Sequence, residues 1–160
     1  MSPVIRSATA DDAETIHALI VGLAIYEHEP DAVENTPDTL RAQLATPHPP
    51  FECLLAEEDG KALGMALFFQ TYSTWVGRPG IWLEDLFVLE AHRGRGIGRA
   101  LLTRVARLAV ERGFGRLEWS VLDWNAPALA FYERLGAVKL GTWRMHRLAG
   151  DALGALATGG

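Results

Sequence analysis

The chain has 160 residues, of which 49% are hydrophobic and 22% charged, and its formal net charge is -5 at pH 7. This composition is that of an ordinary folded protein, and the length suffices for one domain with its own core, so a disordered or fibrous protein is excluded. The negative charge argues against nonspecific nucleic-acid binding, which needs a basic surface, and is compatible with a cationic small substrate.

Hydrophobic periodicity and punctuation by Gly, Pro and capping residues predict strands and helices along the whole chain. Residues 3–8 are a first strand, and a capping box at Thr9–Asp12 opens a helix. That helix has a continuous apolar stripe formed by Ile16, Leu19, Ile20, Leu23 and Ala24. An acidic loop over 27–34 and a short helix from Thr36 to Thr46 follow, and then strands 51–57 and 62–72, which a hairpin at Asp59-Gly60 joins. The next elements are strand 81–89, helix 96–112, which Gly113 ends, and strand 116–122. The last are helix 125–135, which Asn125 caps and Gly136 ends, and one or two strands over 137–148.

The order of these elements defines the fold class. Helices separate the strands only in places, so we expect an α/β protein with a mixed, predominantly antiparallel sheet flanked by helices, rather than a doubly wound one. We expect a single domain over residues 1–150 and a small-residue C-terminal tail over 151–160 that frays.

Several classes of site are not expected. The single cysteine, Cys53, excludes an intrachain disulfide and lies in an apolar run, so a core thiol explains it, and nothing nearby supports a nucleophile. The five histidines are scattered without ligand spacing, so no metal is expected. No apolar stretch approaches the roughly 18 residues of a membrane span, and the N-terminus has no signal-peptide core. We therefore expect no membrane partner, no nucleic-acid partner and a cytoplasmic location.

The most informative segment joins an acidic strand to a basic glycine loop and the start of a helix: Trp82-Leu-Glu-Asp-Leu-Phe-Val-Leu-Glu-Ala-His-Arg-Gly-Arg-Gly-Ile-Gly-Arg99. Glycines let the backbone approach a ligand, and the amides of a helix N-terminus favour a diphosphate. Arginines add charge-assisted contacts to phosphate oxygens. The loop lacks both the G-K-[ST] ending of a P-loop and the G-x-G-x-x-G spacing of a Rossmann fingerprint.

Residues 93–98, Arg-Gly-Arg-Gly-Ile-Gly, resemble the R/Q-x-x-G-x-G/A signature of the GNAT acetyltransferase superfamily, which binds the diphosphate of acetyl-CoA. The resemblance implies the GNAT acyl-CoA N-acyltransferase fold and acetyl-CoA as co-substrate. In this family the strand before the loop carries a bulge and splays from its parallel neighbour, which admits the pantetheine arm. The residues implied to bind acetyl-CoA here are Leu86, Phe87, Val88, Arg93, Gly94, Arg95, Gly96, Ile97, Gly98 and Arg99.

Residues 123–137 look like the second GNAT hallmark, N-x-x-A/S-x-x-F/Y-Y-x-x-x-G-F/A, and add Asn125, Pro127 and Tyr132 to that set. The resemblance extends to the diamine (spermidine/spermine) acetyltransferases and their thialysine-acetylating relatives through segments 4–10, 23–27, 82–85, 123–125 and 141–144. It implies a homodimer, for which Trp75 or Trp143 would suit an interface, although both would equally suit a core. The chain departs from that family in the acidic loop after His28, in a short connection at 58–60 and in Ala126, where glutamate is common. These departures lie near the expected amine pocket and concern the acceptor, not the donor.

Acetyl transfer to an alkyl amine needs a base, because an amine of pKa near 10 is protonated at pH 7. Glu84 is the candidate base, directly or through a water, although a structural ion pair would also explain it. Asp85 is expected to face the other way in an extended strand. Tyr132 is the candidate acid that protonates the departing thiolate. Tyr26, Glu27, Glu84 and Asp85 are the candidate substrate-binding residues, with the acidic loop either assisting or merely solvated.

Three functions are compatible with the sequence. The first is acetylation of a polyamine or thialysine-like amine. The second is the same chemistry on another acceptor, such as an amino acid, an antibiotic or a protein N-terminus. The third is a non-catalytic acyl-CoA-binding module, which the intact glycine loop and Tyr132 disfavour.

Overall fold

The computed structural model describes residues 2–159, and contacts divide the chain into two compact units, Met1–Ser120 and Val121–Gly160. The first unit contains β1 (Val4–Ser7), the 3-10 turn η1 (Ala10–Asp12), α1 (Ala13–Tyr26), α2 (Pro37–Leu44), β2 (Glu52–Glu58), β3 (Lys61–Ser73), β4 (Arg78–Val88), the 3-10 turn η2 (Glu90–His92), α3 (Ile97–Glu111) and β5 (Leu117–Glu118). The second unit contains α4 (Ala126–Arg134) and α5 (Gly150–Ala157).

The strands of the first unit form one sheet in the order β1-β2-β3-β4-β5. Every neighbouring pair is antiparallel except β4 and β5, which are parallel. The prediction of a mixed, predominantly antiparallel sheet is therefore confirmed.

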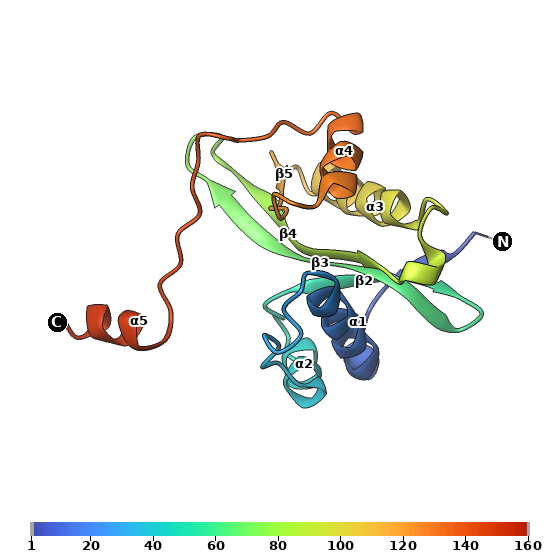
Figure 1. The fold of residues 1–160 in the computed structure, drawn as a ribbon, viewed down its shortest axis with the longest axis horizontal. Helices are drawn as coiled ribbons and strands as arrows, with labels where there is room; N and C mark the ends of the chain where they lie inside the picture. Colours follow the sequence, from blue (N-terminus) through green and yellow to red (C-terminus); the bar gives the residue numbers. More distant parts are fainter. Residues whose placement is uncertain (1, 160) are drawn as a thin grey trace. The chain divides into compact units, whose positions relative to one another are not determined.

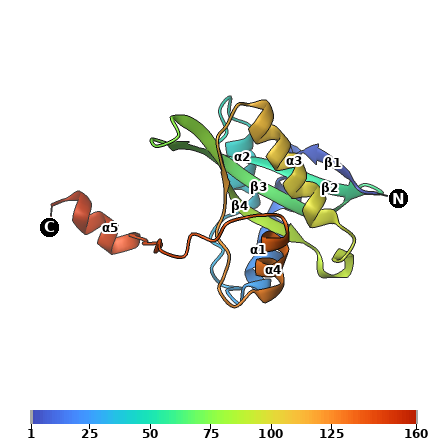
Figure 2. The same ribbon diagram turned by 90° about the horizontal axis from the view of Figure 1, so that it is seen from above.

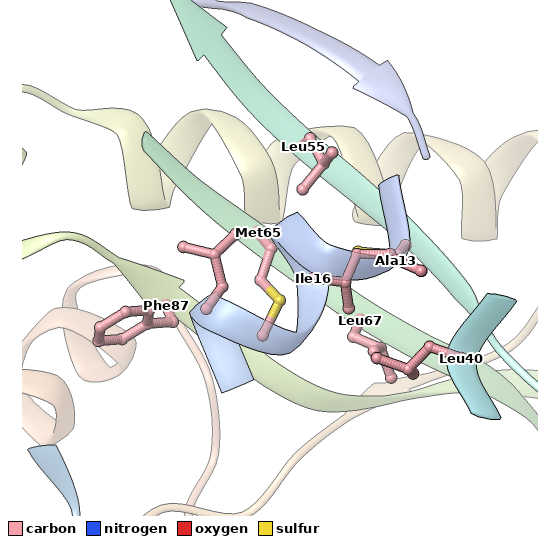
Figure 3. Close-up of a cluster of buried hydrophobic side chains, with 9 residues drawn as sticks. Ala13, Ile16, Leu40, Leu55, Met65, Leu67 and Phe87 are labelled. Atoms are coloured by element: carbon pink, nitrogen blue, oxygen red, sulfur yellow. The ribbon is translucent and has the colours of Figure 1, made fainter. Parts of the chain in front are cut away.

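Helices cover both faces of this sheet. α1 and α2 lie against one face and α3 against the opposite face (Figure 1), with α3 running over the strands (Figure 2). Under α1 and α2, buried apolar side chains from both helices interlock with those of β2, β3 and β4 (Figure 3): Ala13, Ile16, Leu19, Leu40, Cys53, Leu55, Met65, Leu67 and Phe87. Burial of such a cluster is the main favourable term in folding, and it fixes the end of α1 over β4.

Local signals in the sequence set the ends of several elements. Thr9 and Asp12 form the predicted capping box, in which the Thr9 amide donates to the Asp12 carboxylate at 2.8 Å. Asp59 and Gly60 take the left-handed conformation, with φ of 50° and 74°, which confirms the predicted hairpin between β2 and β3.

The second unit confirms one predicted helix and contradicts two other predictions. Asn125 caps α4, its side chain accepting from the Ala128 amide at 3.3 Å, and Gly136 follows the helix with φ of 85°. The strands predicted over 137–148 are wrong, because this segment has no regular secondary structure. The predicted fraying of the tail is also wrong: residues 150–157 form α5, because Ala and Leu are strong helix formers.

Candidate active site

The middle of β4 carries a bulge. Leu67 of β3 pairs with Asp85, whereas the next residue, Phe68, pairs with Leu83, so Glu84 has no partner in the ladder. A residue inserted in this way bends the strand and changes the face to which the following side chains point.

The bulge overturns the expectation that Glu84 and Asp85 face opposite ways. Paired residues share a face, so Asp85 lies on the Leu67 face, and Trp82, which pairs with Phe69, lies on that same face. The Trp82 indole Nε1 donates to Glu84 Oε2 at 2.9 Å, which holds the Glu84 carboxylate on this face too. Both carboxylates therefore point to the side of the sheet that carries α1.

A third carboxylate joins them from the end of α1. Glu27 is the C-cap of α1, and its pKa is raised by burial and by the charge of Glu84. Burial, then Glu84 and then Glu27, raise the pKa of Asp85 from 3.8 to about 7. The three groups form an acidic cluster (Glu27, Glu84 and Asp85), which favours a cationic ligand because a positive charge would relieve their repulsion. Glu29, Asp31 and Glu34 of the neighbouring loop are exposed.

Asp85→Asn is expected to stabilise the fold most at alkaline pH. Because the pKa of Asp85 is about 7 in the folded chain and ordinarily 3.8, the folded chain at pH 5 holds a proton that the unfolded chain has lost. Stability therefore falls as the pH rises from 5 through 7, by roughly 2 kcal/mol, and asparagine removes this loss. Urea unfolding at pH 5 and pH 8 measures it, with the exposed Asp31→Asn as control. An equal gain for Asp85→Asn at both pH values would contradict the expectation.

The edge of β4 that faces β5 is mostly open. β5 pairs with β4 only through Ile81–Leu117 and Trp82–Glu118. Beyond Trp82, no strand in the described part of the chain pairs with this edge of β4. The backbone amides and carbonyls of this edge can hydrogen-bond to an extended ligand in the way that a neighbouring strand would. The residues predicted to contact acetyl-CoA, Leu86, Phe87 and Val88, lie in this stretch. The Val88 carbonyl already accepts a hydrogen bond from Arg93 Nε.

The glycine loop presents a row of open amides. Gly94 and Gly96 have φ of 77° and 78°, a conformation that strongly favours glycine, and Gly96 is the N-cap of α3 without a capping side chain. The first hydrogen bond of the helix runs from the Ala100 amide to the Gly96 carbonyl. The amides of residues 94–99, Ile97 among them, donate to no described residue, which is the arrangement that binds phosphate.

The three arginines of this segment have different surroundings. Arg95 makes a bidentate ion pair with Glu58 of β2, at 2.7 and 3.3 Å. The Arg93 side chain contacts the Tyr26 ring. Arg99 lines a groove of about 480 Å³ beside Gly96, together with Thr103, Arg104 and Arg107. Arg99 is therefore the arginine of the loop best placed to add charge to a bound phosphate.

Gly98→Ala is expected to weaken CoA binding without loss of stability. A methyl group at position 98 would meet only Val88 Cγ2, at 3.8 Å, which is ordinary contact. Alanine also favours the helix by up to about 1 kcal/mol. The same methyl narrows the approach to the open amides, so the Kd for CoA should rise about tenfold. Thermal melting and calorimetry measure the two effects. Gly154→Ala in α5, where nothing lies within 4 Å of the added methyl, is the control; unchanged CoA affinity in Gly98→Ala would contradict the expected role of this turn.

Tyr132 lies in α4 of the second unit, next to Phe131, whose ring centre is 5.3 Å away at an angle of 55°. Burial raises the pKa of Tyr132 above its ordinary value of 10. The phenol therefore keeps its proton at neutral pH, as a general acid must. Pro127 stands in the first turn of the same helix.

Other chemistry finds no support. Cys53 is buried, and burial raises the pKa of its thiol to about 12, so the core-thiol interpretation is confirmed and a thiolate nucleophile is not available at neutral pH. Among residues 2–159, no group of three His, Cys, Asp or Glu side chains could hold a metal ion. Within the same residues, no helix has the length and apolar character needed to cross a bilayer.

Two partners of the site residues were missed at the sequence level. Trp82 orients Glu84 through its indole hydrogen bond. The two residues stand two positions apart in a predicted strand, and this spacing could have indicated that their side chains lie on one face. Glu58 holds Arg95, and this contact between residues 37 positions apart depends on the pairing of β2 with β3 and of β3 with β4, which the local sequence pattern does not show.

Comparison with known proteins shows the family of the chain. Residues 15–137 match the model of the acetyltransferase (GNAT) family. The chain is 36% identical to the thialysine N-epsilon-acetyltransferase of Sus scrofa, over 98% of each protein. It is 40% identical to the L-ornithine N5-acetyltransferase of Arabidopsis thaliana over 81% of the chain, a match that spans 58% of that longer protein. Among solved structures it is similar to an integron cassette protein of V. cholerae, with a TM-score of 0.82, 25% identity and 98% of each chain covered. The chain belongs to the GNAT acetyltransferase family and is an N-acetyltransferase.

Proposed function

We propose that this enzyme transfers the acetyl group of acetyl-CoA to a terminal primary amine of a small polycationic substrate, of the polyamine or diamine type. The acidic cluster carries the proposal. Three carboxylates on one face of the sheet suit a substrate with more than one ammonium group, because one amine can lose its proton and react while another remains paired with a carboxylate.

The relatives support the acceptor class and also favour a second candidate. The names of the Sus scrofa and Arabidopsis thaliana proteins specify thialysine and L-ornithine, which are amino acids with a terminal amine on an alkyl side chain. An amino-acid acceptor brings a carboxylate that the acidic cluster repels at short range. We therefore place the diamine class first and an amino-acid amine second.

The donor side of the site fits acetyl-CoA. The open amides of residues 94–99 suit its diphosphate, with Arg99 beside them, and the unpaired edge of β4 suits the amide-containing pantetheine arm. When bound, acetyl-CoA supplies the acetyl thioester. The chain's own groups orient it and keep the reacting carbonyl near the acidic cluster of the acceptor site.

We infer direct transfer within a ternary complex, because the only thiol is buried and protonated. Glu84 accepts the proton of the acceptor ammonium, and Tyr132 donates a proton to the departing thiolate. Asp85 is the alternative base, because its pKa of about 7 is close to that of an efficient base at neutral pH.

A thiol-release assay tests the proposal. Purified enzyme with acetyl-CoA is given spermidine, putrescine, thialysine, ornithine and lysine in parallel. We expect the highest kcat/KM with a di- or polyamine. Turnover of the amino acids alone would move the assignment to the second candidate, and calorimetry showing no affinity for CoA would remove the proposed donor.

We also propose that residues 1–150 act as one GNAT domain and that the enzyme is a homodimer. Large apolar side chains are exposed after α4, including Val138 at 81%, Trp143 at 69% and Met145 at 75%, and Trp75 is exposed at 85%. Such exposure is typical of a surface that a partner covers. Light scattering on the eluting protein tests it: a monomeric mass would contradict the dimer. A cytoplasmic location stays a prediction.

A further inference from the structure

Arg93 opens the glycine segment, and the sequence predicts that its side chain binds phosphate. The structure places that side chain elsewhere. Its Nε donates to the Val88 carbonyl oxygen at 2.9 Å, and its guanidinium carbon lies 4.7 Å from the centre of the Tyr26 ring and 5.6 Å from that of Phe87. Phe87 belongs to the buried cluster under α1. The guanidinium therefore lies on the α1 face, whereas α3, whose N-terminus carries the open amides, covers the opposite face (Figure 1).

The chemistry of arginine explains why one side chain can make these contacts together. A guanidinium is planar, so it stacks on aromatic rings through its face while it donates hydrogen bonds through its edge. Arg93 thereby joins three segments, namely the end of α1 through Tyr26, the end of β4 through Phe87 and Val88, and the start of the glycine loop. Lysine keeps the charge but has no planar group to stack on the rings while it donates through an edge.

The contact with Tyr26 reaches the acceptor site. Tyr26 is the last residue of α1 and directly precedes Glu27, one of the three carboxylates of the acidic cluster. A ring held by the guanidinium restrains the turn in which α1 ends, and with it the distance from Glu27 to the carboxylates on β4.

We propose that Arg93 is a positioning residue of the acceptor site, which acts through Tyr26 on Glu27, so that amine binding depends on its guanidinium and diphosphate binding does not. This inference rests on the proposed function, and it departs from the phosphate role that the family signature implies for this side chain.

Arg93→Lys separates the two roles. The Kd for CoA is measured by calorimetry without amine, and the KM for the best amine of the panel is measured at saturating acetyl-CoA. We expect the amine KM to rise about tenfold, in keeping with loss of the stacked contact between the guanidinium and the Tyr26 ring, and the Kd for CoA to change less than about twofold. Arg112→Lys is the matched control, because Arg112 also lies over an aromatic ring, Phe114 at 6.0 Å, and pairs with Glu52. Both constants should be unchanged in that control.

A second variant approaches the same contact from the other side. Tyr26→Leu removes the ring, and we expect it to raise the amine KM with the Kd for CoA preserved. In the double variant with Arg93→Lys, the increase in amine KM should be much smaller than the product of the two single-variant increases, because each change breaks the same contact. Independent, fully multiplied effects would overturn the proposal.

A tenfold rise in the Kd for CoA of Arg93→Lys, with a normal amine KM, would also overturn the proposal. It would show that the guanidinium binds the diphosphate of CoA instead. The affinity of the wild-type protein for CoA is measured by calorimetry before the variants are compared. Wild-type protein without affinity for CoA would remove the proposed function itself, a result distinct from any shift among the variants.

Discussion

Tyr132→Phe is expected to lower kcat by a factor of about 10² to 10⁴ and to leave the Kd for CoA within about twofold. Cleavage of the thioester releases a thiolate, which leaves more readily when a proton reaches its sulfur. Burial raises the pKa of Tyr132, so the phenol is protonated across the working pH range and can supply that proton. Phenylalanine keeps the ring, including its packing against Phe131 at 5.3 Å, and removes only the hydroxyl.

Thiol release at saturating substrates measures the effect of Tyr132→Phe, and the pH profile adds a second readout. The wild-type rate should fall at high pH as the phenol ionises, and the variant should lack this fall. Tyr72→Phe is the control, because Tyr72 is 65% exposed on β3. Near-normal turnover by Tyr132→Phe would exclude the phenol as the acid.

Glu84→Gln is expected to lower kcat/KM by a factor of about 10² to 10⁴ at pH 7. The amide is nearly the size of the carboxylate and can still meet the Trp82 indole, so the change removes the base and its charge rather than the shape of the site. The loss should shrink as the pH approaches about 10, where the acceptor amine is already deprotonated. Rates across this pH range check both parts of the expectation.

Two further variants complete the test of the base. Glu52→Gln changes a carboxylate that pairs with Arg112 and should leave the rates unchanged. Asp85→Asn, assayed in parallel, distinguishes the two neighbouring carboxylates. A large loss in Asp85→Asn with nearly normal rates in Glu84→Gln would assign the base to Asp85 instead.

The sequence was sufficient wherever a local signal sets local structure. The capping box at Thr9, the Asp59-Gly60 hairpin and the Asn125 cap each satisfy a backbone conformation or amide within a few residues, so they could be predicted without the fold. The conformation of the glycine loop could be predicted in the same way, because Gly94 and Gly96 indicate a left-handed backbone next to the start of a helix.

Features that depend on pairing between distant residues could not be predicted in the same way. Placing the bulge at Glu84 requires the register of β3 against β4, and the strict alternation of an extended strand gave the wrong face for Asp85. The apolar residues over 137–148 resembled strands in pattern, yet pattern alone does not provide a neighbouring strand to pair with. The Arg93 side chain could be placed only once α1 had been packed over Phe87.

The extra residue in β4 adds an acid to the acceptor site without moving the core side chains that follow it. Leu83 pairs with Phe68 and Asp85 pairs with Leu67, so the ladder passes over position 84, and Phe87 pairs with Met65 on the face that carries α1. Deleting position 84 would therefore restore a regular strand with Phe87 still in the core under α1, and it would remove only the Glu84 carboxylate from the acidic cluster. A single deletion or insertion at this point of β4 can therefore change the number of acids in the acceptor site while the packing beneath α1 is kept.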